Sequence, residues 1–320
     1  SVHTTPDALT VQHALRAMQT AGARCVVSEV SSHAMDQGRV RGVTFDLAVL
    51  TNLTRDHLDY HGDLESYAEA KRKLFHSDGL RYAVINADDN FGSALLDAIP
   101  PGVAPIAYRL ENDPFRTRFP AQWVIGRNLQ FDVNGLSMDV QTPWGSGSLH
   151  CGLLGRFNAS NLLASLASLC VVGLPFQEAL RRLAVTRTVP GRMERFDMGE
   201  GRPLAVVDFA HTAAALEGVL SSLRAHCRGK LWCVFGAGGD RDRGKRSLMG
   251  AVAERHADEI VLTDDNPRTE DAQHIIDDIC SGLKQPATVH IEHDRAHAIG
   301  WAMRHAGAED IVLIAGKGHE

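Results

Sequence analysis

Strand-like and helix-like patterns alternate along most of the chain, and this alternation limits the folds that are open to it. Short apolar runs typical of buried strands occupy residues 45–50 and 82–86, with helical spacing of apolar residues between them. Strands that alternate with helices predict a parallel, doubly wound α/β sheet, because a parallel neighbour is reached only through a crossover. A further apolar run at 25–30 follows a helical pattern at 8–21, and we expect it to be a strand of the same sheet.

The alternation breaks between residues 121 and 153. Short alternating runs there flank Asn134-Gly135 and Gly145-Ser-Gly147, which are turn signals of β-hairpins. We therefore expect a small antiparallel insertion in the doubly wound sheet. A helical pattern follows at 160–172 and stops at Gly173, with Pro175 beyond it.

A second α/β unit begins after the candidate linker 186–191. Its expected strands are residues 204–209, 231–235, 259–263, 288–291 and 310–315. Five strands with helical stretches between them predict a small Rossmann-like domain. We expect two domains, a central one at 1–190 and a C-terminal one at 191–320.

Composition favours small-molecule chemistry in the cytoplasm. The formal charge is -6, from 33 basic and 39 acidic residues, and no long basic run suggests a nucleic-acid partner. No apolar run reaches the roughly 20 residues that span a bilayer, and no signal-peptide pattern follows Ser1. The 6 cysteines lack C-x-x-C spacing, so we interpret them as buried free thiols and not as disulfides or zinc ligands.

One lysine lies where helical spacing predicts an apolar residue. If a helix begins near Asp63, Lys71 falls in its apolar stripe. The other members of that stripe are Leu64, Tyr67, Ala68, Leu74 and Phe75. A buried ammonium needs a partner, and an Asp/His cluster precedes this helix. The cluster contains Asp56, His57, Asp59 and His61. The alternative is a lysine that extends along the edge of the stripe into solvent.

Polar residues also follow the expected strands of the first domain, where ligands gather in open α/β sheets. Glu29, His57 and a modified Lys71 could together hold Mg²⁺, which prefers oxygen ligands. A carbamate formed from Lys71 and CO₂ would supply such oxygens and would explain the burial of this side chain. The alternative is that Asp56 and Asp59 are turn caps and His57 is a core histidine.

Charged loops follow three strands of the second domain. They are Gly236-Ala-Gly-Gly-Asp-Arg-Asp-Arg-Gly-Lys-Arg246, Asp264-Asp-Asn-Pro-Arg268 and Gly316-Lys-Gly-His-Glu320. Arg241 and Arg268 can each grip a carboxylate with two hydrogen bonds, while Asp265 and Glu320 can receive an ammonium group. Together they suit a zwitterionic amino acid, and the alternative is a solvated ring of salt bridges. Lys317 lacks the spacing of a phosphate-binding P-loop.

Six motifs, in this order, resemble those of the Mur ligases of peptidoglycan synthesis. They are Glu29-Val-Ser-Ser-His33, Thr51-Asn-Leu-Thr-Arg-Asp-His-Leu-Asp-Tyr-His-Gly62, Gly191-Arg-Met-Glu194, Val207-Asp-Phe-Ala-His-Thr212, Asp264-Asp-Asn-Pro-Arg268 and Gly316-Lys-Gly-His-Glu320. The resemblance covers essentially the whole chain. Within the family, the chain most resembles the members that add meso-diaminopimelate to UDP-N-acetylmuramoyl-L-alanyl-D-glutamate. It implies that ATP phosphorylates a substrate carboxylate and that the incoming amine attacks the acyl phosphate.

The resemblance also implies a role for each motif. The magnesium-associated and catalytic residues would be Glu29, His57 and Lys71, the last as a carbamate. Contacts to the UDP-muramoyl dipeptide would come from Thr4, Thr5, Ser31, Gln37 and Arg39. Contacts to ATP would come from Asn158, Arg192, Asp208 and His211, with Arg192 near the phosphates and Asp208 on the ribose. The amino-acid site would contain Arg241, Asp265, Asn266, Pro267, Arg268, Gly316 and Glu320.

The chain departs from the family pattern in several ways. The family has a Walker A loop before the position of Thr4 and a uridine-binding domain before that loop, and it continues past Glu320. We therefore expect this chain to be a portion of a longer enzyme. We also expect that enzyme to be a monomer. Without the phosphate loop the chain alone is expected to be inactive. Ala213-Ala214 stands where family members usually have Pro-Asp. The alternatives are a lysine-adding relative and a non-catalytic fragment that only binds ligands.

Overall fold

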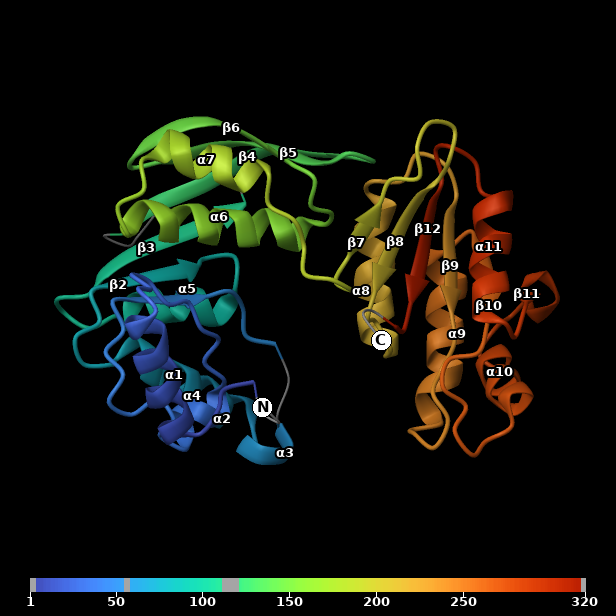
Figure 1. The fold of residues 1–320 in the computed structure, drawn as a ribbon, viewed down its shortest axis with the longest axis horizontal. Coiled ribbons are helices and arrows are strands. Elements are labelled where there is room, and N and C mark those ends of the chain that lie inside the picture. Colours follow the sequence, from blue (N-terminus) through green and yellow to red (C-terminus); the bar gives the residue numbers. More distant parts are fainter. Residues whose placement is uncertain (1–3, 55–57, 111–120, 318–320) are drawn as a thin grey trace. The chain divides into compact units, whose positions relative to one another are not determined.

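The computed structural model describes residues 4–54, 58–110 and 121–317, and the chain in it divides into two compact units (Figure 1). The first unit contains Ser1–Arg127, Asp139–Gly147 and Ser160–Arg181. The second contains Asn128–Met138, Ser148–Ala159 and Arg182–Glu320. The units thus interleave along the chain, and the predicted domain boundary after residue 190 stays a prediction.

The first sheet has six strands in the order β1-β2-β3-β4-β5-β6. Their bounds are Leu47–Leu50, Tyr82–Asn86, Ala104–Leu110, Gln122–Asp132, Gly135–Thr142 and Gly145–Cys151. The strands β1 to β4 pair in parallel. Two-residue turns join β4 to β5 and β5 to β6, so these neighbours run antiparallel. The expected doubly wound α/β sheet with an antiparallel insertion is therefore confirmed.

Helices of the first half of the chain begin at side chains that cap them. Asp7, Ser31, Asp63 and Asp89 each accept a hydrogen bond from a backbone N–H in the first turn of α1, α2, α4 and α5. The helices are α1 (Ala8–Thr20), α2 (Ser32–Asp36), α3 (Leu58–His61), α4 (Leu64–Phe75), α5 (Asn90–Asp97), α6 (Arg156–Val171) and α7 (Phe176–Ala184). Apolar residues of α4 and α5 pack on β1, β2 and β3 and form one core of the first unit.

The strand expected at residues 25–30 does not form. This segment has no regular secondary structure, and the side chain of Val27 is 93% exposed. Within residues 4–54, 58–110 and 121–317, the edge strand β1 pairs with β2 and with no other strand. An apolar run becomes a strand only where a neighbour completes its hydrogen bonds, so the propensity of residues 25–30 is not sufficient.

The second sheet also has six strands, in the order β11-β10-β9-β12-β8-β7. Their bounds in chain order are Glu194–Phe196, Leu204–Asp208, Leu231–Phe235, Glu259–Leu262, His290–Ile291 and Ile311–Ala315. All pairs are parallel except β7 with β8. The five strands expected in this region are confirmed, and the carboxyl ends of β8, β9, β10 and β12 meet at one edge.

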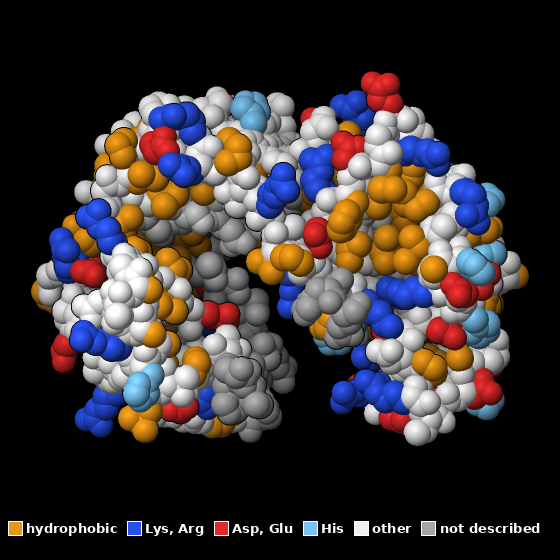
Figure 2. Space-filling model, in the orientation of Figure 1, with side chains coloured by type: hydrophobic (Ala, Val, Ile, Leu, Met, Phe, Trp, Pro, Cys, Tyr) orange, Lys and Arg blue, Asp and Glu red, His pale blue; other side chains and the backbone are white. Residues whose placement is uncertain are grey.

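Alternate residues of these strands enter two different cores. Leu231, Cys233 and Phe235 of β9 pack with α8 (Ala213–Arg224), α9 (Gly244–His256) and α10 (Ala272–Cys280). Trp232 and Val234 pack on the opposite face with α11 (Arg295–His305). A short 3-10 helix spans Pro286–Thr288. Figure 2 shows apolar side chains gathered at the surface where β8, β9 and β12 lie in Figure 1.

The cysteines are free, as predicted, but they are not uniformly buried. Cys151, Cys170 and Cys233 are buried, whereas Cys227 and Cys280 are partly buried. Cys25 is exposed, because the strand expected to bury it does not form. Among the helices of the described ranges, none is long and apolar enough to span a membrane.

A buried histidine attaches residues 128–138 and 148–159 to the rest of the second unit. The side chain of His226, after α8, is 1% exposed. Its Nδ1 lies 2.7 Å from the carbonyl oxygen of Asp132, and its Nε2 lies 2.9 Å from the backbone nitrogen of Gly155. The carbonyl can only accept and the N–H can only donate, so these partners require a neutral ring protonated on Nδ1.

We expect His226 to make the protein less stable in mild acid. Burial lowers the pKa of the folded-state ring below its ordinary value of 6.5, against the opposing effect of the Asp132 carbonyl. The unfolded chain therefore takes up this proton first. The stabilisation is fully present above pH 6.5 and is lost as the pH falls toward the folded-state pKa, by at most about 1.4 kcal/mol per pH unit.

Urea unfolding of the wild type and of His226→Gln across this range measures the effect. Glutamine keeps one donor and one acceptor but does not titrate, so its unfolding free energy should fall less steeply between about pH 7 and about pH 5. Equal slopes in the two proteins would contradict this prediction.

Candidate functional site

Lys71 lies in α4, which begins at Leu64 after the capping residue Asp63, as the spacing predicts. Tyr67, Ala68 and Phe75 of the expected stripe are buried, whereas Leu64 is exposed because it lies in the first turn. The side chain of Lys71 is partly buried, and its Nζ lies 5.2 Å from the centre of the Tyr67 ring. The ammonium therefore lies against an aromatic face and not along a bare apolar stripe.

Aromatic rings connect this lysine to the start of α2. The ring of Tyr67 lies 5.4 Å from that of His61, whose Nε2 is 2.9 Å from the hydroxyl of Ser32. The His61 ring also contacts the rings of His33 and Tyr60. His61 is thus a packing residue in the described chain. Asp56 and His57 lie outside the described residues, and only the backbone of Asp59 is described.

Four of the residues that are predicted to contact the UDP-muramoyl dipeptide lie together in the first unit. The hydroxyl of Thr5 accepts from the backbone N–H of Ser31 and donates to the carbonyl of Glu29. The guanidinium of Arg39 donates to the carbonyl of Thr5 at 2.8 Å and to the side-chain oxygen of Gln37 at 2.6 Å. Thr4 is exposed beside them. This arrangement leaves the Ser31 hydroxyl on the N-cap of α2 and holds Arg39 in one position.

The amide of Gln37 continues the network toward α4. It donates to the Tyr60 hydroxyl, which donates to Asp36, and Lys73 donates to the other oxygen of Asp36 at 2.8 Å. The Lys73 and Tyr60 hydrogen bonds hold the pKa of Asp36 below its ordinary value. The side chains near α2 and α4 therefore form one polar network that surrounds the predicted substrate contacts.

The predicted magnesium set is only partly within the described residues. Glu29 is exposed in the segment before α2, and Lys71 is in α4 of the same unit. No group of three His, Cys, Asp or Glu residues that could hold a metal occurs in residues 4–54, 58–110 and 121–317. That search does not test the predicted set, because His57 lies outside these ranges and Lys71 is of another type. The magnesium site stays a prediction.

Three of the predicted ATP contacts lie around the end of β8. The carboxylate of Asp208 is buried and accepts hydrogen bonds from the backbone N–H groups of Met193 and Ala210, each at 2.8 Å. The guanidinium of Arg192 lies 5.7 Å from the centre of the Phe209 ring, and the His211 ring contacts the same ring. The side chain of Asn158, in the first turn of α6, donates to the carbonyl of Leu154 at 2.8 Å, just before this helix begins.

The glycine turn after β9 and the loop after β10 lie against each other. The backbone N–H of Gly239 donates to the carbonyl of Asn266 at 2.8 Å, and the guanidinium of Arg268 donates to the carbonyl of Gly239. A Cβ on Gly239 would lie 1.9 Å from the carbonyl oxygen of Pro267, so only glycine permits this approach. Arg241 is exposed on the same turn. The predicted amino-acid contacts Arg241, Asn266, Pro267 and Arg268 are thus brought together.

The end of β12 joins this group. Gly316 lies beside the carboxylate of Asp265, and its N–H donates to the carbonyl of Asp208. The ammonium of Lys317 lies 3.5 Å from Asp265 Oδ1 and 3.3 Å from Asn266 Oδ1. Asp265 and Asn266 therefore receive an ammonium group within the chain itself. Glu320, the remaining predicted contact, lies outside the described residues.

Two charged residues that no motif singled out hold these loops in place. Arg246 and Glu270 form an ion pair beside the glycine turn, and Arg246 is fully buried. Its position could have been found, because it shares a helical face with Met249, Gly250 and Ala253. Glu270 carries no comparable signal, since its partner is 24 residues away in the chain.

Comparisons with known proteins agree with the motifs. Residues 1–169 match the model of the Mur ligase middle domain, and residues 191–318 match that of the Mur ligase glutamate ligase domain. The chain is 50% identical over 318 residues to UDP-N-acetylmuramoyl-L-alanyl-D-glutamate--2,6-diaminopimelate ligase of Coxiella burnetii, covering 99% of this chain and 64% of that protein. It is 51% identical to the protein of the same name from Alkalilimnicola ehrlichii, covering 99% of this chain and 62% of that protein.

A solved structure agrees with the fold. The structure of a UDP-N-acetylmuramoyl-L-alanyl-D-glutamate--2,6-diaminopimelate ligase matches with a TM-score of 0.79 and 40% identity, covering 99% of this chain and 64% of that chain. The chain therefore spans less than two thirds of the length of these relatives.

Proposed function

Because the chain belongs to the Mur ligase family, we propose that it acts in the ATP-dependent addition of meso-diaminopimelate to UDP-N-acetylmuramoyl-L-alanyl-D-glutamate. The observation that carries this proposal is the identity of about one half, over nearly the whole chain, to relatives named for that reaction. The reaction class is amide ligation through an acyl phosphate. The product would be a building block of peptidoglycan.

The loops at the end of the second sheet support an amino-acid substrate. Arg241 and Arg268 offer planar guanidinium groups that suit carboxylates, and meso-diaminopimelate has two carboxylates where lysine has one. Asp265 and Asn266 already accept from the Lys317 ammonium, so an incoming ammonium group would find acceptors of the same kind. Arg268 would distinguish diaminopimelate from lysine.

The polar network of the first unit supports binding of the UDP-muramoyl dipeptide. Arg39 is held by Gln37 and Thr5, so its charge can meet an anionic substrate without losing much side-chain entropy. On the nucleotide side, Arg192 beside Phe209 offers a charge for the phosphates. Each carboxylate oxygen of Asp208 already accepts one backbone N–H, from Met193 or from Ala210. A ribose hydroxyl would therefore donate to the remaining lone pair of one of these oxygens.

The donor set fits Mg²⁺ on one condition. Glu29 supplies a carboxylate and His57 an imidazole, but a protonated Lys71 would repel the ion. Carbamylation replaces that charge with an anionic oxygen donor, which Mg²⁺ prefers. When bound, the ion would neutralise charge on the transferring phosphoryl group.

The protein's own residues would mainly position the reactants. The carboxylate of the substrate takes the γ-phosphoryl group of ATP, and the amine nitrogen then attacks the carbonyl carbon of the acyl phosphate. The new C–N bond forms, the C–O bond then breaks with its electron pair leaving on inorganic phosphate, and the proton lost by the amine nitrogen passes to phosphate or water. Loops that hold both reactants in place can supply much of the rate, because positioning alone is worth several powers of ten.

Amine-dependent phosphate release by the full-length protein tests this proposal. With ATP, Mg²⁺ and the UDP-muramoyl dipeptide present, we expect kcat/KM for meso-diaminopimelate to exceed that for lysine by about a hundredfold or more. A preference for lysine would identify a lysine-adding relative. Binding of the ligands with no phosphate release for any amine would identify a non-catalytic binding protein.

A further inference from the structure

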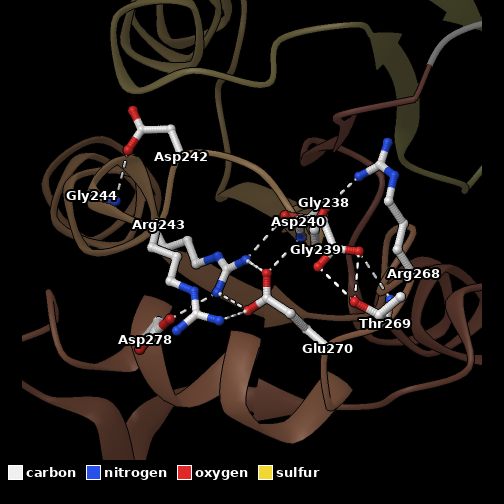
Figure 3. A network of polar contacts seen from close by, with 11 residues as sticks. Gly238, Gly239, Asp240, Asp242, Arg243, Gly244, Arg268, Thr269, Glu270 and Asp278 are labelled. Carbon is white, nitrogen blue, oxygen red and sulfur yellow. Dashed lines mark hydrogen bonds and ion pairs between the residues drawn. The ribbon is translucent and has the colours of Figure 1, made fainter.

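A fully buried arginine lies directly behind the proposed amino-acid site. Arg246, in the first turn of α9, has a side chain that is 0% exposed. Its two terminal nitrogens donate to both carboxylate oxygens of Glu270, at 2.8 and 3.0 Å. They also donate to Asp278 at 2.8 Å and to the carbonyl of Gly238 at 3.2 Å (Figure 3). A guanidinium cannot lose its proton, so it is buried here only because these partners exist.

Stability alone is a poor explanation for this ion pair. The Nε of Arg246 is buried and has no hydrogen-bond partner within the described part of the chain. Buried ion pairs are often no more stabilising than well-packed apolar residues of the same size, and an unpaired donor adds a cost. A role beyond stability would therefore explain why a charged group occupies this position.

Glu270 connects Arg246 to two loops, residues 236–243 and 264–270. We name these two loops the loop pair. Its Oε1 accepts from the backbone N–H of Asp240 at 2.6 Å, and its Oε2 lies 3.1 Å from the Arg243 guanidinium. The Asp240 carboxylate in turn accepts from the backbone N–H and the hydroxyl of Thr269. Arg246 itself reaches the glycine turn through Gly238. Each loop thus holds the other (Figure 3).

The loop pair contains two residues in the left-handed region, which side chains other than glycine rarely adopt. Asp240 has a φ of 52° and Arg268 a φ of 53°. Such conformations persist where surrounding contacts impose them, and they are common at binding sites. Asp240 directly precedes Arg241, so both proposed carboxylate-binding arginines have their backbone direction set within the loop pair.

We propose that Arg246, acting through Glu270, is a positioning residue of the amino-acid site. It holds the loop pair at the separation at which Arg241 and Arg268 can grip one diaminopimelate molecule. This inference rests on the proposed function, because it needs an amino-acid substrate at these arginines. Arg246 touches no substrate itself.

Calorimetric binding of meso-diaminopimelate to the full-length protein and its variants tests the inference. Glu270→Gln keeps the size of the side chain but removes the charge that grips Arg246, and we expect the Kd to rise about tenfold to a hundredfold. Arg246→Met removes both guanidinium hydrogen bonds to Glu270, which keeps its contacts with Asp240 and Arg243, and should lower both affinity and thermal stability. In Arg246→Met/Glu270→Leu the buried charges are replaced together, so thermal stability should recover while affinity does not.

A matched control lies at the opposite end of the same sheet. The partly buried carboxylate of Asp310, before β12, accepts from the Trp232 indole at 3.0 Å and from the backbone N–H of Lys230 at 2.7 Å. Asp310→Asn should lower the melting temperature without changing the Kd. This variant separates a general loss of stability from a loss of loop position.

The outcomes separate the inference from the proposed function. If the wild type binds no meso-diaminopimelate, the proposed function and the inference both fail. If the wild type binds it and Glu270→Gln binds equally well, only the inference fails. Recovery of affinity together with stability in the double variant would also overturn the inference, because the ion pair would then be merely structural.

Discussion

Lys71→Ala is expected to abolish amide formation by the full-length protein, with kcat falling by about a thousandfold or more. The side chain lies in α4, partly buried against the Tyr67 ring and connected through His61 to the start of α2. If it carries the proposed carbamate, alanine removes an anionic ligand of Mg²⁺. Phosphate release with meso-diaminopimelate as the amine measures the loss.

A small carboxylic acid should partly rescue this variant. Acetate or propionate can enter the space left by the lysine and supply the missing carboxylate oxygens, so activity should rise with the acid concentration in Lys71→Ala but not in the wild type. Lys230→Ala is the control, because Lys230 is exposed and pairs only at the surface with Glu259. Near wild-type activity in Lys71→Ala would support the alternative that this lysine only extends along the helix surface.

Arg268→Ala is expected to raise the KM for meso-diaminopimelate by about a hundredfold and to remove most of the preference over lysine. Two hydrogen bonds from a guanidinium to a carboxylate are each worth about 1.5–3 kcal/mol, and lysine lacks the second carboxylate. The side chain of Arg268 is exposed and is already directed to the glycine turn by its contact with Gly239. Steady-state kinetics with both amines gives the two values.

Arg268→Lys separates the charge from the geometry of this group. Lysine keeps the positive charge but cannot form two parallel hydrogen bonds, so its KM should lie between those of the wild type and Arg268→Ala. Arg255→Ala removes an exposed arginine of α9 that pairs with Glu217. This control should leave the KM values for both amines unchanged. An unchanged ratio of kcat/KM values in Arg268→Ala would assign substrate choice to other residues.

Local patterns were sufficient for most of the fold. Each expected strand of the second sheet forms, and the signal is clearest for β9 and β12, which are apolar and buried along their whole length. The edge strand β11 is shorter than expected, and its Ile291 is exposed. The Asn134-Gly135 signal marks the turn at residues 133–134 to within one residue. The second turn was placed too late, because Gly145-Ser-Gly147 lies in β6 and the turn occupies residues 143–144. The strand expected at 25–30 does not form. Its residues have the right propensity, but nothing in the described chain pairs with them.

The candidate site divides in the same way. Arg241, Asp265, Asn266, Pro267, Arg268 and Gly316 were found because they follow strands whose carboxyl ends share one edge. Lys71 was found because helical spacing makes a charged residue conspicuous. Glu270 was not found, since its importance lies in a contact with Arg246 that no local pattern records. His226 was also missed, because its partners come from residues 132 and 155.

Residue patterns along the chain were enough to predict the two α/β units, the antiparallel insertion, the family and the loops that carry the proposed chemistry. Each of these depends on residue types at short spacing, which periodicity and motifs record directly. The folded structure was needed to show that residues 25–30 form no strand, that His226 is a buried neutral histidine joining distant segments, and that Arg246 and Glu270 connect the loop pair. These features depend on contacts between segments that are far apart in the sequence. Whether a strand forms, or a charged side chain can be buried, depends on the partners that those segments supply.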